Sequence, residues 1–564
     1  MLSYRKLAMR VLGRPLHTEG IDSPRPASQR AAAFILTAAM LTTLAAPAFA
    51  DIWRIEDGDI TVKAGDTKGT NKVSQGTTID KVDTDTIITN QNKDIASSHT
   101  VTIDAGDDKV EVTLDNVNIK ADSGSALTSN GDVTLTLKGE NHLTGGNGDT
   151  YGGDGIASTG SLTISGGETD SLTAQGGNGI YGSGSLTISG GENDSLTAQG
   201  GSGANGISSS GSLTISGGTV TANGDDGGRG ISSSGSVTIS GGSTVTANGG
   251  SGTISGGDGI WSGGGVTISG GSTVTANGGN GGSLVGGDGI RSGGGLTVSD
   301  GTVTAKGGNG DSKDGYGGDG IRSGGVVTIS GNTVNAAGGY GGKVGGYGIC
   351  SFDRVAISGG TVEAAGGNGS TGGGSGIYSS VIDLSGSLEL TAKAGSPTGK
   401  ALLQNGRELD LDTIKDKLGP GAKVTATDAN GDSKQVSIPR PVEPEEPVIP
   451  EESSSSSDGG SATPSAPVSP LPGLTVTDKD GQRISYTSTQ SGNTLTVCVG
   501  RFTASFRISL AALRQLRAEG IDTITFQTIL CSTTLSVDEL LAMGGEDAEA
   551  VLTHRLTDSS LTVG

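Results

Sequence analysis

A Gly-Ile dipeptide recurs nine times between residues 155 and 377, and the position after each isoleucine holds many of the chemically versatile side chains of this sequence. In chain order these positions are Ala157, Tyr181, Ser208, Ser232, Trp261, Arg291, Arg322, Cys350 and Tyr378. An aromatic face beside guanidinium forks suits a sugar ring that bears a carboxylate. The predicted ligand-binding residues are therefore Trp261, Arg291, Arg322 and Tyr378. The alternative is a solvated column that happens to hold large residues.

Aspartates precede four of these isoleucines by two positions, in the phrase Gly-Gly-Asp-Gly: Asp154, Asp258, Asp288 and Asp319. The last three occupy successive repeats, and carboxylates stacked at strand spacing repel each other unless a cation or an arginine neutralises them. Calcium suits such oxygen-rich loops. The predicted metal ligands are therefore Asp258, Asp288 and Asp319. The alternative is neutralisation by Arg291 and Arg322, three residues after Asp288 and Asp319.

Three cysteines and four histidines are too few for a dense disulfide framework or a repeated Cys/His metal spacing. Cys498 and Cys531 are the disulfide candidates, with two buried thiols as the alternative. Catalysis is the rival class of function, and it would need a calcium cluster with a basic proton abstractor, or paired carboxylates. No Asp-Asp pair recurs on a strand face and no Ser-His-Asp grouping stands out. We name no catalytic residue and lean against an enzyme.

The elements that must position these residues are short strands. Successive isoleucines lie 24 to 31 residues apart, and a Leu or Val follows each of the first eight after a constant six residues. Phrases such as 213–216 and 274–276 alternate apolar and hydroxyl side chains with period two, as half-buried strands do. Three such strands per repeat, separated by glycine turns, predict a mainly β fold. Each repeat would be one coil of a right-handed parallel β-helix.

Glycine supports this fold and excludes others. It supplies 105 of 564 residues, and 78 of these lie between residues 145 and 380. No strict Gly-X-Y period accompanies them, which excludes collagen, and a flexible linker would not keep Ile and Leu in register over nine repeats. We attribute the glycine to corners that need tight or left-handed backbone. The formal charge of −22 argues against nucleic acid as a partner, because phosphate binding needs a basic face.

Repeat length varies at one corner only, between the third strand and the next isoleucine. The insertions there predict a glycine-rich ridge on one side, where solenoids often bind; they are residues 248–259, 277–289, 306–320, 337–348 and 365–376. Third strands also carry Thr-x-Thr pairs on four successive repeats, from Thr219/Thr221 to Thr302/Thr304. This array resembles the flat ice-binding face of some β-helical proteins. The alternative is that threonine is simply a good surface strand residue.

Composition divides the rest of the chain. Residues 1–50 have the basic start, the apolar run and the Ala48-Phe49-Ala50 cleavage pattern of a signal peptide, with an uncleaved anchor as the alternative. No other stretch is apolar enough to cross a membrane, so we expect no transmembrane segment in the mature chain. The remaining predicted parts are an N-terminal cap with the first coils (51–95), the β-helix repeats (96–400), the C-terminal end of the solenoid (401–440), a Pro/Glu/Ser-rich disordered linker (441–473) and a small α+β domain (474–564).

Within the last domain the pattern predicts strands at 484–487, 494–499, 504–508 and 521–530. Ser509 is expected to cap a helix over 510–519 that Gly520 closes, and a second helix is expected over 537–543.

The runs 112–119, 125–128, 133–137 and 140–144 resemble secreted bacterial β-helix proteins described as carbohydrate-binding-domain-containing, with a pectate-lyase-like solenoid, and so do the following coils. The resemblance covers about residues 55–400. It implies binding of acidic polysaccharide, calcium in some members and no established catalysis, but no fixed ligand motif that could be carried over. The last domain is similar to C-terminal modules of other exported bacterial surface proteins, with no known chemistry.

We therefore expect a secreted or cell-surface, non-catalytic binding protein for acidic polysaccharide. The alternatives are a structural stalk or adhesin that contacts proteins, a polysaccharide lyase and an ice-binding protein.

Overall fold

The computed structural model describes residues 51–146, 153–167, 169–439 and most of 473–563, the last range with gaps at 479–482, 485, 492, 500–502, 529–531, 544–547 and 555–558. The predicted signal peptide at 1–50 and nearly all of the predicted linker at 441–473 lie outside the described residues. The chain divides into two compact units, with the boundary between Pro444 and Glu445.

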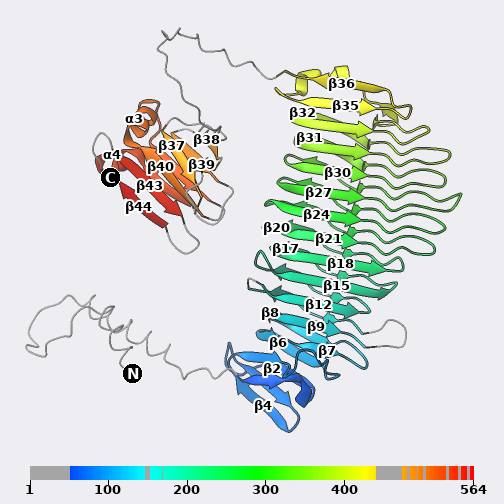
Figure 1. Cartoon of the computed structure of the whole chain (residues 1–564), viewed down its shortest axis with the longest axis vertical. Coiled ribbons are helices and arrows are strands. Elements are labelled where there is room, and N and C mark those ends of the chain that lie inside the picture. Colours follow the sequence, from blue (N-terminus) through cyan, green and yellow to red (C-terminus); the bar gives the residue numbers. More distant parts are fainter. Residues whose placement is uncertain are drawn as a thin grey trace, which may run out of the picture. The chain divides into compact units, whose positions relative to one another are not determined.

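The first unit is a parallel β-solenoid of about 14 turns (Figure 1). Each central turn contributes three short strands. The first strands are β10 (Ile156–Ser158), β13 (Ile180–Gly182), β16 (Ile207–Ser209), β19 (Ile231–Ser233), β22 (Ile260–Ser262), β25 (Ile290–Ser292), β28 (Ile321–Ser323) and the starts of β31 (Ile349–Ala365) and β32 (Ile377–Lys393). The second strands are β11 (Leu162–Ser165), β14 (Leu186–Ser189), β17 (Leu213–Ser216), β20 (Val237–Ser240), β23 (Val266–Ile268), β26 (Leu296–Val298) and β29 (Val327–Ile329). The third strands are β12 (Ser171–Gly176), β15 (Ser195–Ser202), β18 (Thr219–Asp225), β21 (Thr244–Asn248), β24 (Ser272–Asn277), β27 (Gly301–Lys306) and β30 (Thr333–Ala337).

Equivalent strands of successive turns pair in parallel, in register over their apolar positions. Ile260 of β22, for example, pairs with Ile231 below and Ile290 above. Ile260 and Ile290 are fully buried, and the stacked Ile, Leu, Val and Ala residues form one continuous core. The predicted solenoid with a narrow aliphatic core is therefore confirmed. Every second residue of a strand points inward, and because each turn adds the same small aliphatic side chains, these are enough to fill the core.

Antiparallel hairpins close both ends of the solenoid. At the N-terminal end β2 (Ile60–Ala64) pairs in parallel with β6 (Val101–Asp115) and antiparallel with β3 (Asn71–Gln75), and β4 (Thr78–Asp83) extends β3. The first turns also contain β1 (Ile52–Arg54), η1 (Ile55–Asp57), β5 (Thr86–Thr89), β7 (Asn118–Lys120), β8 (Leu127–Lys138) and β9 (Glu140–Thr144). The C-terminal end contains β33 (Leu402–Gln404), β34 (Arg407–Glu408), η2 (Leu411–Lys417), β35 (Lys423–Thr427) and β36 (Ser433–Ser437). These ends pair backbone groups that an open coil would leave exposed.

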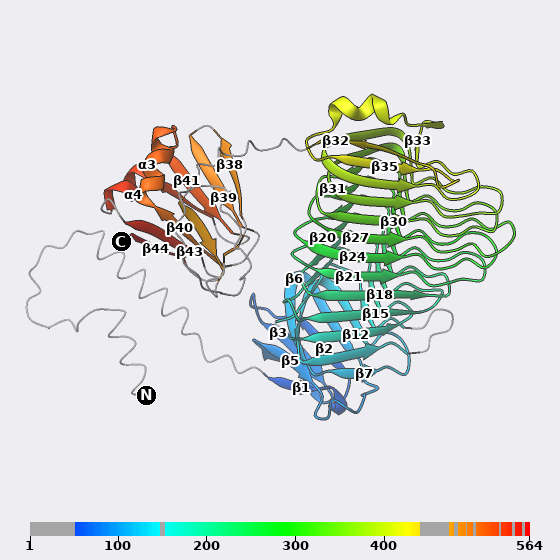
Figure 2. The same cartoon turned by 45° about the horizontal axis from the view of Figure 1, so that its top comes forward.

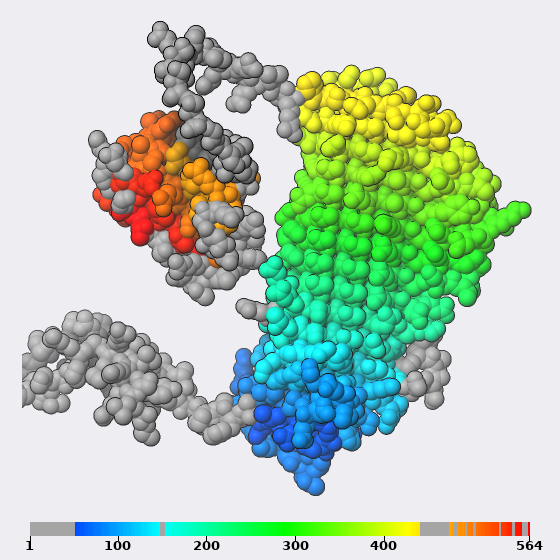
Figure 3. All heavy atoms as spheres, in the orientation of Figure 1, coloured from blue at the N-terminus to red at the C-terminus, as the bar shows by residue number. Residues whose placement is uncertain are grey.

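The five insertions lie together at one corner, between third and first strands, and we call them the glycine ridge (Figure 2). Parallel bridges join the outgoing limbs through Gly252, Gly281, Gly310, Gly341 and Gly369. Similar bridges join the returning limbs through Ser255, Val285, Tyr316, Val344 and Gly372. A green segment projects at the right of Figure 3, beyond the surrounding surface.

The glycines of the ridge allow close backbone packing; of the predicted tight or left-handed backbone, the left-handed form does not occur at this corner. None of them has a φ in the left-handed region. Instead the N–H of Gly257 donates to the carbonyl of Gly250 at 2.9 Å, and that of Gly279 to Gly257 at 2.8 Å. A Cβ on Gly279 would clash with the carbonyl oxygen of Gly250. Left-handed glycines occur at another corner, at Gly241 and Gly242 between β20 and β21.

The described residues of the second unit form two four-stranded sheets and two helices. One sheet has the order β37 (Leu474–Thr477), β40 (Ala504–Ser509), β43 (Glu549–His554), β44 (Ser559–Val563). The other has the order β38 (Thr487–Ser491), β39 (Thr494–Cys498), β41 (Thr523–Gln527), β42 (Ser532–Ser536). The helices are α3 (Leu510–Ala518) and α4 (Val537–Met543).

The helix predictions for this unit are confirmed, but two strand boundaries are not. Ser509 caps α3 by accepting from the N–H of Ala512 at 3.2 Å. The predicted strand at 484–487 is displaced to β38, because the N–H of Ile484 donates to Val476 and ties this segment to the first sheet. The predicted strand at 521–530 is shortened to β41.

Candidate functional site

Trp261, Arg291, Arg322, Cys350 and Tyr378 lie beside one another on successive turns, and we call them the outer column. Their registered pairing was predicted and is present. Neighbouring backbones in such a ladder are about 4.8 Å apart. The column therefore offers a linear arrangement of an aromatic ring and two guanidinium groups parallel to the solenoid axis, although its role in ligand binding stays a prediction.

Cation–π contacts occupy part of this column. The guanidinium of Arg229 lies 4.5 Å from the ring centroid of Trp261. That of Arg322 lies 5.2 Å from the ring centroid of Phe352. Each contact fixes an aromatic ring against a charge and leaves less of both free for a ligand.

At the upper end of the column, Tyr378 stacks on Tyr347 with ring centroids 5.1 Å apart and an interplanar angle of 17°. Cys350, expected on the outer surface, is instead only 1% exposed, which corrects that expectation. Burial raises the pKa of its thiol to about 12, so the group is neutral and unreactive at physiological pH.

Arg291 differs from its neighbours. Its side chain is exposed, and it forms no hydrogen bond, ion pair or ring contact with any other residue that the structure describes. It lies in register between Trp261 on one turn and Arg322 on the next. Of the two arginines among the predicted ligand-binding residues, Arg291 is the one without an ion pair or ring contact in the described residues, although its charge also acts on buried Asp319 and acts to lower the pKa of that carboxyl.

Asp258, Asp288 and Asp319 belong to a second column, which we call the aspartate column. Oδ1 of Asp258 accepts from the backbone N–H of Asp288 at 2.9 Å. Oδ1 of Asp288 accepts from Asp319 at 2.7 Å, and Oδ1 of Asp319 from Tyr347 at 2.7 Å. The same bond recurs lower in the solenoid through Asp154, Asn178 and Asn205. These side chains thus satisfy backbone donors where each loop re-enters the sheet.

Charge neutralisation along the aspartate column is uneven. Nε of Arg229 is 3.2 Å from Oδ2 of Asp258, and Nη1 of Arg322 is 3.4 Å from Oδ2 of Asp319. Asp288 forms no ion pair with a described residue. Burial, with the carboxylates of Asp319 and Asp258, raises the pKa of Asp288 to about 8, and burial raises that of Asp319 to about 6. The raised pKa favours the protonated, neutral form of Asp288 in the folded state.

This donor set does not favour calcium. All three Oδ1 atoms accept backbone N–H groups and two Oδ2 atoms face arginines. Calcium takes six to eight oxygen ligands, and these carboxylates leave it few. Across the described ranges, no group of three or more His, Cys, Asp or Glu side chains is arranged to hold a metal ion. Calcium binding by Asp258, Asp288 and Asp319 stays a prediction.

The structure describes one of the two cysteines of the predicted disulfide. Cys498 forms no disulfide with a described residue, and its thiol donates to Oε1 of Gln527 at 3.5 Å. Cys531 lies outside the described residues, so its pairing with Cys498 stays a prediction.

The threonine array of the third strands is in register as well. Thr219, Thr244, Thr273 and Thr302 pair across successive turns, as do their partners two residues on. The regular spacing of these threonines is a consequence of the repeat. It does not by itself favour ice over another ligand, so ice binding stays a prediction.

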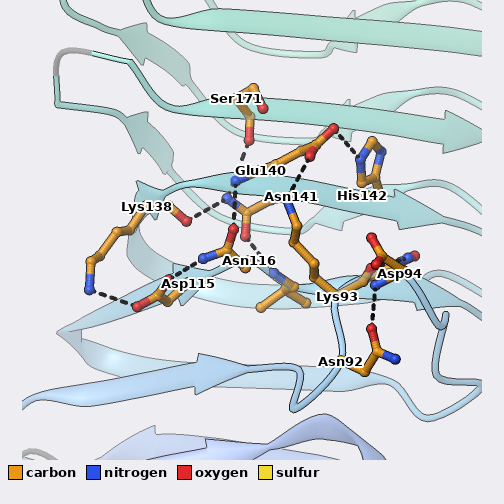
Figure 4. A network of polar contacts seen from close by, with 12 residues as sticks. Asn92, Lys93, Asp94, Asp115, Asn116, Lys138, Glu140, Asn141, His142 and Ser171 are labelled. Carbon is orange, nitrogen blue, oxygen red and sulfur yellow. Dashed lines mark hydrogen bonds and ion pairs between the residues drawn. The ribbon is translucent and has the colours of Figure 1, made fainter.

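A polar network on β6, β8 and β9 ties turns together (Figure 4). Buried Asn141 occupies the position of Leu172 in the next turn; its Oδ1 accepts from the N–H of Val117 at 2.9 Å. On the surface, Glu140 contacts His142 at 3.2 Å and Lys93 at 3.3 Å, contacts that lower the pKa of Glu140. Glu140 is ionised and exposed, so it does not have the raised pKa of a general acid.

The sequence analysis missed Arg229, Tyr347 and Phe352. The first two occupy the aspartate-column position, two residues before Ile231 and Ile349, so the repeat alignment contained their signal. Phe352 had no such signal, because the register of β31 shifts between Ser351 and Arg354.

Comparisons with models of protein families, with curated proteins and with solved structures gave no match. No helix in the described parts of the chain is long and apolar enough to cross a bilayer. The fold and the two columns are therefore the observations from which a function is argued.

Proposed function

We propose that the solenoid binds an acidic polysaccharide without catalysing a reaction on it, and that the outer column is the binding site. The observation that carries this proposal is the free guanidinium of Arg291 between Trp261 and Arg322. A guanidinium fork pairs with a uronate carboxylate through two parallel hydrogen bonds. Adjacent turns then offer an indole and a second guanidinium to the neighbouring sugar units.

Export to the cell surface or beyond belongs to this proposal. Its support is the signal-peptide pattern of residues 1–50, together with a repeat fold whose exterior is hydroxyl-rich and acidic. Calcium is included only as a condition of the test, because the aspartate column offers it few free oxygens.

The experiment is a glycan array followed by affinity measurement with an acidic polymer such as polygalacturonate, with calcium and with chelator. We expect Arg291→Ala to weaken binding by about tenfold, the usual worth of a charge-assisted hydrogen bond. Arg407→Ala is the matched control, since it removes an exposed arginine of β34 far along the chain from the column. Equal losses in both variants, or no binding to any acidic glycan, would reject the site. Release of unsaturated oligosaccharides would instead indicate a lyase.

The adhesin alternative has its own observation. Ile254, Leu284, Tyr316 and Tyr340 are large apolar side chains exposed on the glycine ridge. Exposed apolar residues that gather on one element are typical of protein contacts. Binding to a protein that survives Arg291→Ala and is lost on replacing Ile254 and Leu284 by serine would favour this function over the glycan.

A further inference from the structure

A pocket of about 330 Å³ lies at the N-terminal end of the solenoid, away from both columns. One wall is the loop between β2 and β3, residues 65–70, and the other is the outward side of the turns that contain β5, β6 and β8. The β2–β6 end of the chain is blue in Figure 1. The volume falls in the range of small-molecule sites.

Backbone hydrogen bonds within the loop fix the shape of the first wall. The N–H of Gly65 donates to the carbonyl of Thr70 at 2.8 Å, and the N–H of Thr70 donates to Thr67 at 3.0 Å. A Cβ on Gly65 would clash with Thr70, and Gly69 has a φ of +81°. At the base, Asn71 is buried and its Nδ2 donates to Thr86 Oγ1 and to the carbonyl of Glu111, each at 2.9 Å. The pocket is therefore held open by the fold before a ligand arrives.

The polar groups of the second wall are available. Thr113 and Thr136 lie beside each other on adjacent turns, and Thr84 lines the same pocket. Their hydroxyls form no hydrogen bond with other described residues. A hydroxyl both donates and accepts, as sugar hydroxyls do. Such a wall matches a polyhydroxylated ligand better than it matches an apolar one.

The charges of the pocket favour a cation. Asp85 and Asp108 are exposed and form no ion pair or side-chain hydrogen bond with described residues, whereas Glu111 is paired with Lys109 at 2.8 Å. Lys68 is the one further cation of the lining. The lining thus carries three carboxylates and two ammonium groups, a net charge of −1, within a chain of formal charge −22 that attracts cations at long range.

We infer that this pocket binds a saccharide unit that carries a protonated amine, with Asp85 and Asp108 around the ammonium group and the threonines on the ring hydroxyls. The site is independent of the proposed function. Thr136 is the pocket residue nearest to the outer column in the order of turns. The turn that contains it lies five turns before the turn of Trp261, so the two turns are roughly 24 Å apart along the solenoid axis.

The test is a ligand-observed NMR titration of the full chain with glucosamine, glucose, glucuronate and putrescine. We expect glucosamine to bind roughly tenfold more tightly than glucose or glucuronate, because only it offers both hydroxyls and an ammonium. The double variant Asp85→Asn, Asp108→Asn should lose that preference, and Thr113→Val with Thr136→Val should weaken all sugars. Asp122→Asn, an exposed aspartate outside the pocket, is the control.

Each result bears on the inference. All four aspartate and threonine substitutions lie on the surface, and unchanged melting temperatures establish that the variants are folded. Putrescine binding as tightly as glucosamine would overturn the saccharide assignment. Glucuronate binding as tightly as glucosamine would overturn the assignment of a positively charged ligand. Glucosamine affinity unchanged in the double aspartate variant would overturn the site. Arg291→Ala should leave glucosamine binding intact, so failure here and failure of the outer column are distinguishable.

Discussion

Asp288 is buried between two carboxylates of like charge and forms no ion pair with a described arginine; burial and its two neighbours outweigh the more distant charge of Arg322 and raise its pKa, which favours the protonated form. Its Oδ1 still accepts the N–H of Asp319 at 2.7 Å, so the protonated group remains hydrogen-bonded. Asp258 and Asp319 face arginines instead. An ionised carboxylate without a counter-charge would be more costly in this buried setting than a neutral one, because desolvation penalises the charged form.

This protonation predicts a pH-dependent gain from Asp288→Asn. The folded-state pKa of about 8 lies above the ordinary value of 3.8, so the native state binds the extra proton between these values, and wild-type stability falls as the pH rises toward 8. The amide keeps an acceptor at Oδ1 and cannot ionise. We expect the variant to gain about 1–3 kcal/mol in free energy of unfolding at pH 8 and little at pH 4. Denaturant unfolding at both pH values measures this, with exposed Asp311→Asn as the control; an equal gain at both would contradict the assignment.

His554 predicts the opposite slope in the second unit. It is fully buried, Nε2 lies 2.9 Å from Oγ1 of Thr533, and Nδ1 has no partner among the described residues. Burial lowers its pKa, so the unfolded chain binds the proton more readily. Stability of this unit should fall as the pH drops below about 6.5. The ring centroid of His554 lies 5.5 Å from that of Phe506, so His554→Phe keeps an aromatic ring there and removes the titrating group. Calorimetric scans should then show no pH dependence of the stability of this unit below about pH 6.5; a dependence that persists would belong to another group.

At the scale of elements, the glycine ridge shows how loops can stack without a side-chain core. Outgoing and returning limbs alternate along one chain of backbone hydrogen bonds, in which Gly257 donates to Gly250, Gly279 to Gly257 and Gly287 to Gly279. Each turn repeats these bonds at 2.8–3.0 Å up to Gly395. Such close approach is possible only where no Cβ intervenes.

We therefore predict that Gly279→Ala destabilises the solenoid by about 2–4 kcal/mol, in the range of severe overpacking. The added Cβ would clash with the carbonyl of Gly250, and φ plays no part. Gly182→Ala is the control, because a Cβ there would meet its nearest atoms only at 3.9 Å. Urea unfolding of the two variants compares them. Similar losses in both would show that the ridge tolerates side chains.

At the scale of the whole molecule, a formal charge of −22 opposes the approach of any polyanion. The proposed site must therefore act at short range, through Arg291 and its neighbours, against a long-range repulsion. This distinguishes it from a basic groove that gathers anions from a distance.

Long-range repulsion and short-range attraction together predict an unusual salt dependence of the affinity for the proposed polysaccharide. Between about 0.01 M and 0.15 M salt the Debye length falls from roughly 30 Å to 8 Å, which screens the repulsion more than the contact pair. We expect affinity for polygalacturonate to rise over this range and to rise more steeply in Arg291→Ala, because that variant keeps the repulsion and lacks the attractive pair that salt also screens. Affinity that falls steadily from the lowest salt would show that attraction to an extended basic surface dominates.

The sequence by itself determined the solenoid, its turn boundaries and which residues share a column. Period-two alternation and a constant six-residue step are local properties, and they fixed which side of Ile260 and Ile290 faces inward before any contact was known. A different local signal, the capping Ser509 followed by the closing Gly520, predicted α3. The shifted strand at β38 was not predictable, because Ile484 is held by a hydrogen bond to Val476 that no local pattern records.

Only the tertiary structure decided how the columns are used. The partner of Asp258 is Arg229 from the preceding turn, and Cys350 is buried although its position in the repeat faces outward. The ridge glycines serve interlimb packing, which depends on the distance between chain segments and not on their own φ. The pocket beside Asp85 and Asp108 arises from a hairpin folding back over later turns. In each case the deciding interaction joins chain segments that a loop or a whole turn separates, so loop length and stacking geometry set the distance.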